Sequence, residues 1–360
     1  MPIVTTEHFK NGNLPLSKNG IPQVSDDDYH RLRGYKLEKD DIVFSRVGSI
    51  DINAYVEQSQ QGWLFSGRVL RVRPIKSVNS LCLHYILSTE SVKRSIRNRA
   101  VGQTMPSINT PILSNTKINI PQSVVEQKKI ANLLSLLDER ITTQSKIIDK
   151  LQSLIKGLND SLYQQYGNEI MTSFSKLGQS YSGLSGKLAD DFGIGKPYIT
   201  YLNVYSNNVV NENDYQYVRI SDGEKQNVVK YGDVLFTLSS ETPEEVGVGS
   251  VYLGKDDVYL NSFCFGIHIE NKGLAYSPYL SYYVSSTPFR KFIYPFAQGS
   301  TRFNLCKADF EKADIKLPSL DNQKHIYAIL NHITEKIETE KMILERYTIQ
   351  KQYLLRQMFI

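Results

Sequence analysis

The sequence predicts an α+β protein in which two α/β domains are joined by two long helices packed as an antiparallel coiled coil. Apolar residues recur by alternating threes and fours in mid-chain and again at the C-terminus. The second run, from Ile326, lies 196 residues after the first, from Ile130. A repeat of this length with one long helix per copy indicates a duplicated domain-plus-helix unit rather than a solenoid.

Each apolar run forms a seam with the 3.5-residue period of a helix that winds on a partner helix. One polar residue interrupts the seam at the same place in both copies, Gln144 and Glu340. Because a large domain separates the two helices, we expect them to pack antiparallel; the alternative is two unrelated amphipathic helices. The predicted seam residues are Ile130, Leu134, Leu137, Ile141, Ile148, Leu151, Leu158, Ile326, Leu330, Ile333, Ile337, Leu344 and Leu354.

Helix start and stop signals predict the domain boundaries. Ser123 and Glu126 have capping-box spacing, Ser319 is a plausible N-cap, and Gly167 is a plausible stop for the first helix. We therefore predict a first domain at 1–121, a central helix at 122–166, a second domain at 167–317 and a C-terminal helix at 318–360.

The two predicted domains share one order of elements. The first contains a strand at 41–44, a polar loop with Arg46, strands at 64–65 and 69–73, a helix at 80–99, and a Gly102-Gln103-Thr104 turn. The second repeats this order with a strand at 231–236, a strand at 263–269, a helix at 278–296, and a Gly299-to-Arg302 turn.

The second copy carries one segment without a counterpart in the first. Phe174 to Lys196 precedes Pro197-Tyr198-Ile199-Thr200, whereas the matching Pro2-Ile3-Val4-Thr5 stands at the start of the sequence. Either an upstream segment is omitted, or the first domain lacks its opening strand and loop.

Composition sets broad limits on the class of protein. Residues 1–166 contain 22 Lys/Arg and 15 Asp/Glu, whereas residues 167–360 contain 20 and 22, so a nucleic-acid partner is permitted but not required. The three cysteines lack metal-ligand spacing, and neither a signal peptide nor an apolar run of about 18 residues is present. These features indicate a cytoplasmic protein with no membrane segment.

No constellation of catalytic residues is evident. The sequence contains no P-loop, no dinucleotide-binding turn, no methyltransferase Asn/Asp-Pro-Pro-Tyr loop, and no metal-spaced His/Cys cluster. His84 and His325 lie on predicted helices and are interpreted as structural. The chain is therefore predicted not to be an enzyme and to bind no metal or cofactor.

Taken together, these motifs resemble the specificity (S) subunit of type I restriction–modification systems. The resemblance lies in the strands DDIVF and GDVLF, the Gly-containing turns after a helix, and the helix entries EQKKIANLLSLLDERI and DNQKHIYAILNHITEKI. It implies two target-recognition domains that each read half of a bipartite DNA site, and two conserved helices that set the spacer. It further implies double-stranded DNA and two methyltransferase (M) subunits as partners, and restriction (R) subunits joined through the M–S core. S-adenosylmethionine, ATP and Mg are expected on those partners.

Candidate DNA contacts lie in the shared loops and on the basic helix ends, where side chains could reach bases or phosphates. A solvated charge or a purely structural turn is the alternative at each position. The candidates are Arg46, Lys93, Arg94, Arg97, Arg99, Thr104, Arg290, Lys291, Thr301 and Arg302. Two other functional hypotheses stay open: a coiled-coil scaffold that joins two partner-binding domains without reading DNA, and a recognition fragment of a single-chain restriction–methylation enzyme.

Overall fold

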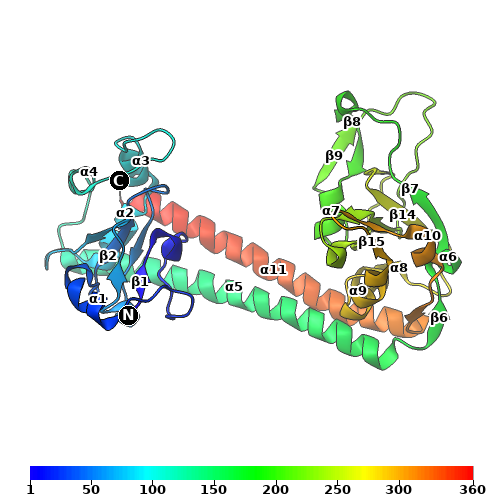
Figure 1. Cartoon of the computed structure of the whole chain (residues 1–360), viewed down its shortest axis with the longest axis horizontal. Coiled ribbons are helices and arrows are strands. Elements are labelled where there is room, and N and C mark those ends of the chain that lie inside the picture. Colours follow the sequence, from blue (N-terminus) through cyan, green and yellow to red (C-terminus); the bar gives the residue numbers. More distant parts are fainter. Residues whose placement is uncertain (360) are drawn as a thin grey trace. The chain divides into compact units, whose positions relative to one another are not determined.

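The computed structural model describes residues 1–359 and divides the chain into two compact units. Unit 1 comprises residues 1–146 and the C-terminal residues from Lys341, and unit 2 comprises Ile147–Glu340. Two long helices, α5 (Val124–Tyr166) and α11 (Leu320–Met358), each contribute residues to both units. Figure 1 shows them in green and red.

The two long helices pack together in opposite directions, as predicted. In unit 1, the Nζ of Lys351 near the end of α11 lies 2.5 Å from Oδ1 of Asp138 in the first half of α5. In unit 2, Ile326 in the first half of α11 belongs to the cluster that also packs against Leu158 of α5. Every predicted seam residue is buried or half-buried, and so are the polar interruptions Gln144 and Glu340.

The predicted helix ends agree with the structure. Helix α5 begins after Ser123, whose Oγ accepts a hydrogen bond of 3.5 Å from the amide of Glu126. It ends before Gly167, whose amide donates to the carbonyl of Tyr163 at 2.7 Å. Helix α11 begins immediately after Ser319, whose carbonyl accepts from Gln323 at 2.8 Å.

Unit 1 contains a three-stranded antiparallel sheet in the order β3-β2-β5 and a separate parallel pair, β1 with β4. Two clusters of buried side chains form its core, one of which contains Trp63. Its elements before α5 are β1 (Ile3–Val4), α1 (Asp26–Arg31), β2 (Ile42–Ser45), β3 (Asn53–Tyr55), β4 (Leu64–Phe65), β5 (Val69–Val72), α2 (Ser80–Leu87), α3 (Glu90–Arg97) and α4 (Thr110–Ser114).

Unit 2 contains a four-stranded sheet, β12-β10-β14-β7, and three smaller sheets, β13-β8-β9, β11-β16-β15 and β17-β6. Its elements are β6 (Ile170–Thr172), α6 (Phe174–Leu177), β7 (Gly178–Ser182), β8 (Phe192–Ile199), α7 (Tyr201–Ser206), β9 (Tyr215–Val218), β10 (Val234–Thr237), β11 (Ser239–Ser240), β12 (Gly249–Val251), β13 (Tyr259–Leu260), β14 (Cys264–Ile269), α8 (Ser277–Tyr283), α9 (Thr287–Ile293), β15 (Ala297–Gln298), β16 (Phe303–Leu305), α10 (Lys307–Lys312) and β17 (Ile315–Leu317).

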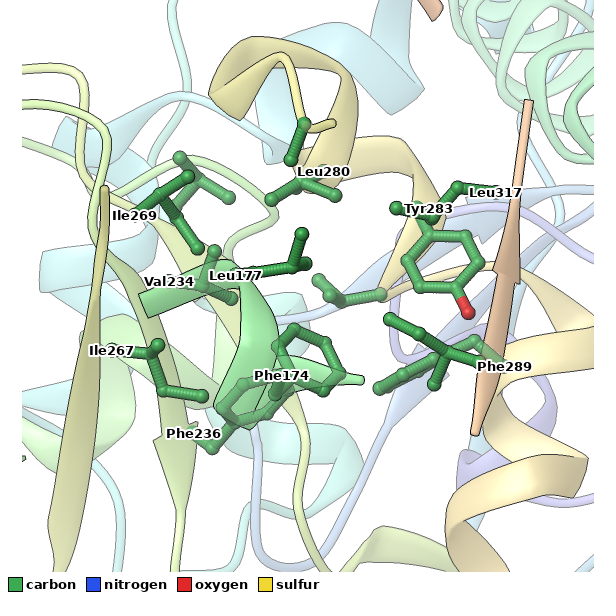
Figure 2. Close-up of a cluster of buried hydrophobic side chains, with 14 of the residues drawn as sticks. Phe174, Leu177, Val234, Phe236, Ile267, Ile269, Leu280, Tyr283, Phe289 and Leu317 are labelled. Carbon is green, nitrogen blue, oxygen red and sulfur yellow. The ribbon is translucent and has the colours of Figure 1, made fainter. Parts of the chain in front are cut away.

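The main core of unit 2 is aromatic. Figure 2 shows Phe174 of α6 beside Phe236 of β10 and Leu177 close to Val234. The rings of Phe174 and Phe236 meet edge to face with centroids 5.4 Å apart, a favoured aromatic geometry. Segment 174–177 therefore contributes Phe174 and Leu177 to the core, while Ser175 and Lys176 stay exposed.

The single helix predicted at 80–99 is wrong, because the structure has two helices there, α2 and α3. The chain breaks at Ser88 and Thr89, whose hydroxyls donate to the carbonyls of His84 and Ile86 at 2.8 and 2.7 Å. Such local bonds compete with helical ones. The prediction for 278–296 fails for the same reason: Ser286 Oγ donates to Tyr283 O at 2.7 Å, and α8 gives way to α9.

Candidate nucleic-acid interface

In unit 1, the two predicted contact loops lie side by side. The loop after β2 is joined to the 101–107 loop by a bridge between Val47 and Ser107. The carbonyl of Arg46 accepts from the amide of Ile108 at 2.9 Å. The structure therefore brings Arg46 and Thr104, both exposed, onto neighbouring loops. We call residues 46–50 and 101–107 the unit 1 loop pair.

Glycine is required in this loop pair for a backbone reason. Gly102 has a φ of +99°, and a Cβ there would lie 2.9 Å from the carbonyl oxygen of Met105. Only glycine adopts this conformation without strain. The turn that carries Thr104 therefore stays tight on the loop next to that of Arg46.

Arg46 is available for a ligand. Its side chain makes one hydrogen bond among the described residues, from Nη1 to the carbonyl of Gly67 at 3.2 Å. A guanidinium has five N–H donors in a fixed fork, so most of them are free to meet a base edge or a phosphate.

Unit 2 builds an equivalent pair of loops. Strand β11 (Ser239–Ser240) pairs with β16, and residues 299–302 turn between β15 and β16. We call residues 239–245 and 299–302 the unit 2 loop pair. Gly299 has a φ of +143°, and a Cβ there would lie 2.1 Å from the carbonyl oxygen of Arg302. Both glycine-containing turns are thus fixed by the same steric requirement.

Arg302 occupies the tip of the unit 2 loop pair and is exposed, as is Thr301. Its Nη2 donates to Oγ of Ser239 at 3.2 Å, and its guanidinium lies 5.7 Å from the ring centroid of Phe263. A cation over an aromatic face is held in place yet keeps its outer N–H groups free.

The two loop pairs differ in which loop carries the arginine. Strand register matches Phe44 with Phe236, so the counterpart of Arg46 is Leu238. The two glycine turns match Met105 with Arg302. Each loop pair thus forms a platform with one exposed guanidinium. In unit 1 the arginine lies on the loop after the central strand, and in unit 2 it lies on the glycine-containing turn.

The predicted basic stripe on α3 does not form one free surface. Arg97 forms ion pairs with Asp51 and Glu90, and these carboxylates raise its pKa. Arg99 donates to the carbonyl of Asn115 at 2.8 Å. Lys93 is half-buried and faces a cavity, whereas Arg94 is exposed.

In unit 2, the two basic candidates on α9 also separate. The guanidinium of Arg290 donates to the carbonyls of Gly247, Glu244 and Val246 at 2.7, 2.7 and 2.8 Å. Burial lowers the pKa of Arg290. Lys291 is exposed. Arg290 therefore fixes the segment that follows β11, whereas Lys291 stays exposed to solvent.

These paired platforms can be compared with known proteins. The family model described as "Type I restriction modification DNA specificity domain" matches residues 1–153 and 185–346. The chain belongs to this family. It is accordingly a specificity subunit and not an enzyme, and the family implies assembly with DNA and with the other subunits of a type I system.

A curated relative and two solved structures are similar to this specificity subunit. A putative type I restriction enzyme MjaX specificity subunit of Methanocaldococcus jannaschii is 27% identical, over 97% of this chain and 84% of that protein. A chain from a study of type I R-M complex assembly has a TM-score of 0.58 at 15% identity, covering 89% of this chain and 82% of that one. The S subunit from M. genitalium has a TM-score of 0.55 at 15% identity, covering 91% and 84%.

Repeated glutamines anchor each domain of the specificity subunit to its helix. The Oε1 of Gln127 accepts from the amide of Asn79 at 2.7 Å, and its Nε2 donates to the carbonyl of Pro121 at 2.7 Å. Gln323 repeats both bonds, at 2.8 Å from Tyr276 and 2.9 Å to Pro318. The repeated Gln-Lys pair at the start of each long helix was visible in the sequence, but sequence reasoning assigned the glutamines no role.

A second repeated contact links helix α2 or α8 to the long helices. In unit 1, Tyr85 donates to Oδ2 of Asp138 at 2.7 Å, and Asp138 also binds Lys351. In unit 2, the hydroxyls of Tyr282 and Thr334 are 2.8 Å apart. The tyrosine is kept while its partner changes from a carboxylate to a hydroxyl.

Sequence reasoning also missed the polar side chains that hold β11. Tyr201 donates to the carbonyl of Ser239 at 2.8 Å, and Ser240 donates to Oε2 of Glu245 at 3.0 Å. A hydrogen bond from Tyr205 lowers the pKa of Glu245, as do Ser240 and Thr242. The signal was the Ser-Ser pair that follows β10, a strand of the predicted repeat.

Apolar side chains remain exposed on the long helices of each unit. On unit 1 they include Leu133 and Leu136 of α5 with Ile349 and Tyr353 of α11; on unit 2, Leu154 is 47% exposed.

The described residues contain no group of His, Cys, Asp and Glu arranged to hold a metal ion. In the same residues, none of the helices has the length and apolar character needed to cross a membrane.

Proposed function

We propose that each unit reads one half of a bipartite double-stranded DNA site through its loop pair. The observation that supports this most directly is the duplication of the platform, with one exposed arginine in each copy. Two platforms on one chain suit a target with two separate half-sites better than a single continuous site.

Within each platform we assign different roles to the candidate residues. Arg46, Thr104, Thr301 and Arg302 contact bases or phosphates, because they are exposed at the loop tips. Arg94 and Lys291 contact phosphates. Arg97, Arg99 and Arg290 act through the loops and helices that they hold in place. Lys93, which is half-buried, stays a candidate phosphate contact.

We also propose that the helix pair sets the spacer and docks the methyltransferase subunits. Two M subunits fit the duplication, one for each copy of the domain-plus-helix unit, and the exposed Leu133, Leu136 and Tyr353 supply apolar surface for them. The R subunits join through the M–S core. S-adenosylmethionine, ATP and Mg bind to those partners, and the complex acts in the cytoplasm.

The decisive experiment exchanges residues 167–317 for the same domain of another specificity subunit. Methylome sequencing of a host that carries the chimera with cognate M subunits should show one half-site changed and the other kept. The wild-type gene is the control. A change in both half-sites would show that the domains read DNA jointly, and normal assembly without site-specific methylation would favour the scaffold function.

A further inference from the structure

The sheet of unit 1 ends on an open edge. Strand β5 pairs with β2 on one side, and no described strand of unit 1 pairs with its other side. Its counterpart in unit 2 is β14, because Val72 and Ile267 occupy equivalent positions opposite Ile42 and Val234. Strand β14 is paired on both sides, since β7 lies against it along Phe265–Ile269.

The apolar face beside this edge is also less covered in unit 1. Five side chains in unit 2 are fully buried, with exposed fractions of 0–1%: Phe265, Ile267, Phe310, Ile315 and Leu317. Their counterparts in unit 1 are only half-buried: Leu70, Val72, Leu113, Ile118 and Ile120. We call these five residues and the free edge of β5 the open trough.

In unit 2, a single segment fills the equivalent space. Strand β6 pairs with β17, the short helix α6 inserts Phe174 and Leu177, and β7 pairs with β14. The ring of Phe174 lies 5.1 Å from that of Phe310. Figure 2 shows Phe174 and Leu177 beside Phe236 and Val234 of the sheet.

We propose that the open trough is a binding site for a polypeptide segment of the same kind as residues 170–182. The occupant is a short strand, a turn that inserts one aromatic and one aliphatic side chain, and a second strand antiparallel to β5. It supplies apolar cover for the half-buried side chains of the trough, and its backbone pairs with an edge that has no partner strand in residues 1–359.

The geometry of unit 2 also indicates where the occupant is attached. There, the chain leaves β7 and enters β8, whose Tyr198–Ile199 pair in parallel with β13. Ile3–Val4 of β1 pair with β4 in the same way. The occupant is therefore tethered on the N-terminal side of β1.

One position of the occupant must differ from unit 2. The ring of Tyr181 lies 2.2 Å from where a Cβ on Gly266 would stand, and unit 1 has Arg71 at that position. The Nη1 of Arg71 donates to the carbonyl of Lys36 at 2.7 Å. A small residue must therefore face Arg71.

The hydrogen bond that Tyr181 makes in unit 2 is also not needed in unit 1. Tyr181 donates to Oδ2 of Asp233 at 2.6 Å. The equivalent carboxylate, Asp41, already accepts from Nε and Nη2 of Arg73 at 2.7 and 2.8 Å. A serine in place of the tyrosine therefore leaves no buried acceptor without a donor.

The test fuses residues 168–182 with Tyr181→Ser ahead of Met1, through a Gly/Ser linker as long as the segment from Ser182 to Pro197. The chain has one tryptophan, Trp63, buried in unit 1, so its fluorescence follows the unfolding of that unit. The fusion should raise the midpoint of thermal unfolding, measured by this fluorescence, by about 4 °C or more. It should also slow amide exchange at Arg71 and Arg73, which face the open edge, by about tenfold or more.

The matched control is the same fusion with its added Phe174 and Leu177 equivalents changed to Asp. It carries the same linker and strands but cannot fill the trough. Equal midpoints and equal exchange for the two fusions would overturn the proposal. Equal protection by the free peptide at equimolar concentration would overturn the tethered attachment. Leu70→Asp, in the open trough, should abolish the gain in midpoint that the fusion gives, when the Leu70→Asp protein is compared with and without the fused segment.

Discussion

At the scale of single residues, the side chains that we propose as DNA contacts differ in their surroundings. Arg46 and Arg302 present guanidinium groups from loop tips. In contrast, the guanidinium groups of Arg97 and Arg290 donate to neighbouring carboxylates and carbonyls of the chain. A buried or paired guanidinium contributes mainly through the geometry it maintains. Charge alone therefore does not decide which arginines are available to a ligand.

We predict that Arg46→Ala and Arg302→Ala each weaken recognition of one half-site only. Loss of a bidentate contact to a base should reduce binding by about 5- to 150-fold, the equivalent of about 1–3 kcal/mol. Competition binding with DNA altered in one half-site at a time measures this. The controls are Lys39→Ala and Lys255→Ala, which remove one exposed charge from the same units. Equal losses in the variants and their controls would refute a specific contact.

We predict that His84 makes unit 1 less stable as the pH falls below neutral. Burial and the charge of Lys351 lower the pKa of His84 to about 4, from the ordinary value of 6.5. Its neutral ring donates from Nδ1 to Oδ1 of Asn53 at 2.7 Å. Because the unfolded chain takes up a proton first, this contribution is complete above pH 6.5 and is lost as the pH falls toward 4.

The measurement is urea denaturation followed by Trp63 fluorescence between pH 7 and pH 4. The loss attributable to His84 is at most about 3 kcal/mol. His84→Asn keeps a donor near Asn53 but does not titrate, so its stability should vary less with pH. An unchanged pH profile in this variant would assign the effect to other groups.

At the scale of elements, each domain is fixed to a long helix by a duplicated set of bonds. Gln127 and Gln323 are 2% and 0% exposed, and each accepts from one backbone amide and donates to two backbone carbonyls. A buried polar group without a partner is costly, so these bonds define how the domain meets the helix.

We therefore predict that Gln127→Ala destabilises unit 1 by about 1–3 kcal/mol, because the amide of Asn79 and the carbonyl of Pro121 lose their partner. Urea denaturation with Trp63 fluorescence measures the change. Lys128→Ala, on the exposed neighbour, is the control and should have little effect. Wild-type stability in Gln127→Ala would show that the anchor is dispensable.

At the scale of the whole molecule, two units share two helices. Helices α5 and α11 both pass from one unit to the other, so their length is a property of the molecule rather than of either domain. In the function that we propose, this arrangement separates reading, assigned to the loop pairs, from spacing, assigned to the helices.

We predict that inserting one heptad in both helices lengthens the DNA spacer while both half-site sequences are kept. The insertions, after Ile148 and at the matching point before Glu340, preserve the seam phase and add about 10 Å, or about three base pairs. Methylome sequencing reports the spacer. Insertion in one helix alone shifts the register and should destabilise the protein. An unchanged spacer in a folded paired variant would leave the helix pair as a docking surface only.

The sequence by itself determined the duplication, the two long helices and their antiparallel packing. A seam period and a fixed offset are local patterns, and burial of apolar side chains translates them directly into helix packing. The same patterns led to the family. They could not show that the helix at 80–99 breaks, because the break depends on the hydrogen bonds that the hydroxyls of Ser88 and Thr89 form with backbone carbonyls.

The tertiary structure alone decided which charged residues are free and which loops meet. Arg46 and Thr104 are far apart in the chain but lie on neighbouring loops, while Arg290 is turned inward to three carbonyls. The sequence indicated the unmatched segment 174–196, and the structure showed how residues of that segment cover the sheet of unit 2 and which edge of the unit 1 sheet has no partner strand among the described residues. Partners of side chains and free strand edges follow from long-range contacts, which a local pattern does not encode.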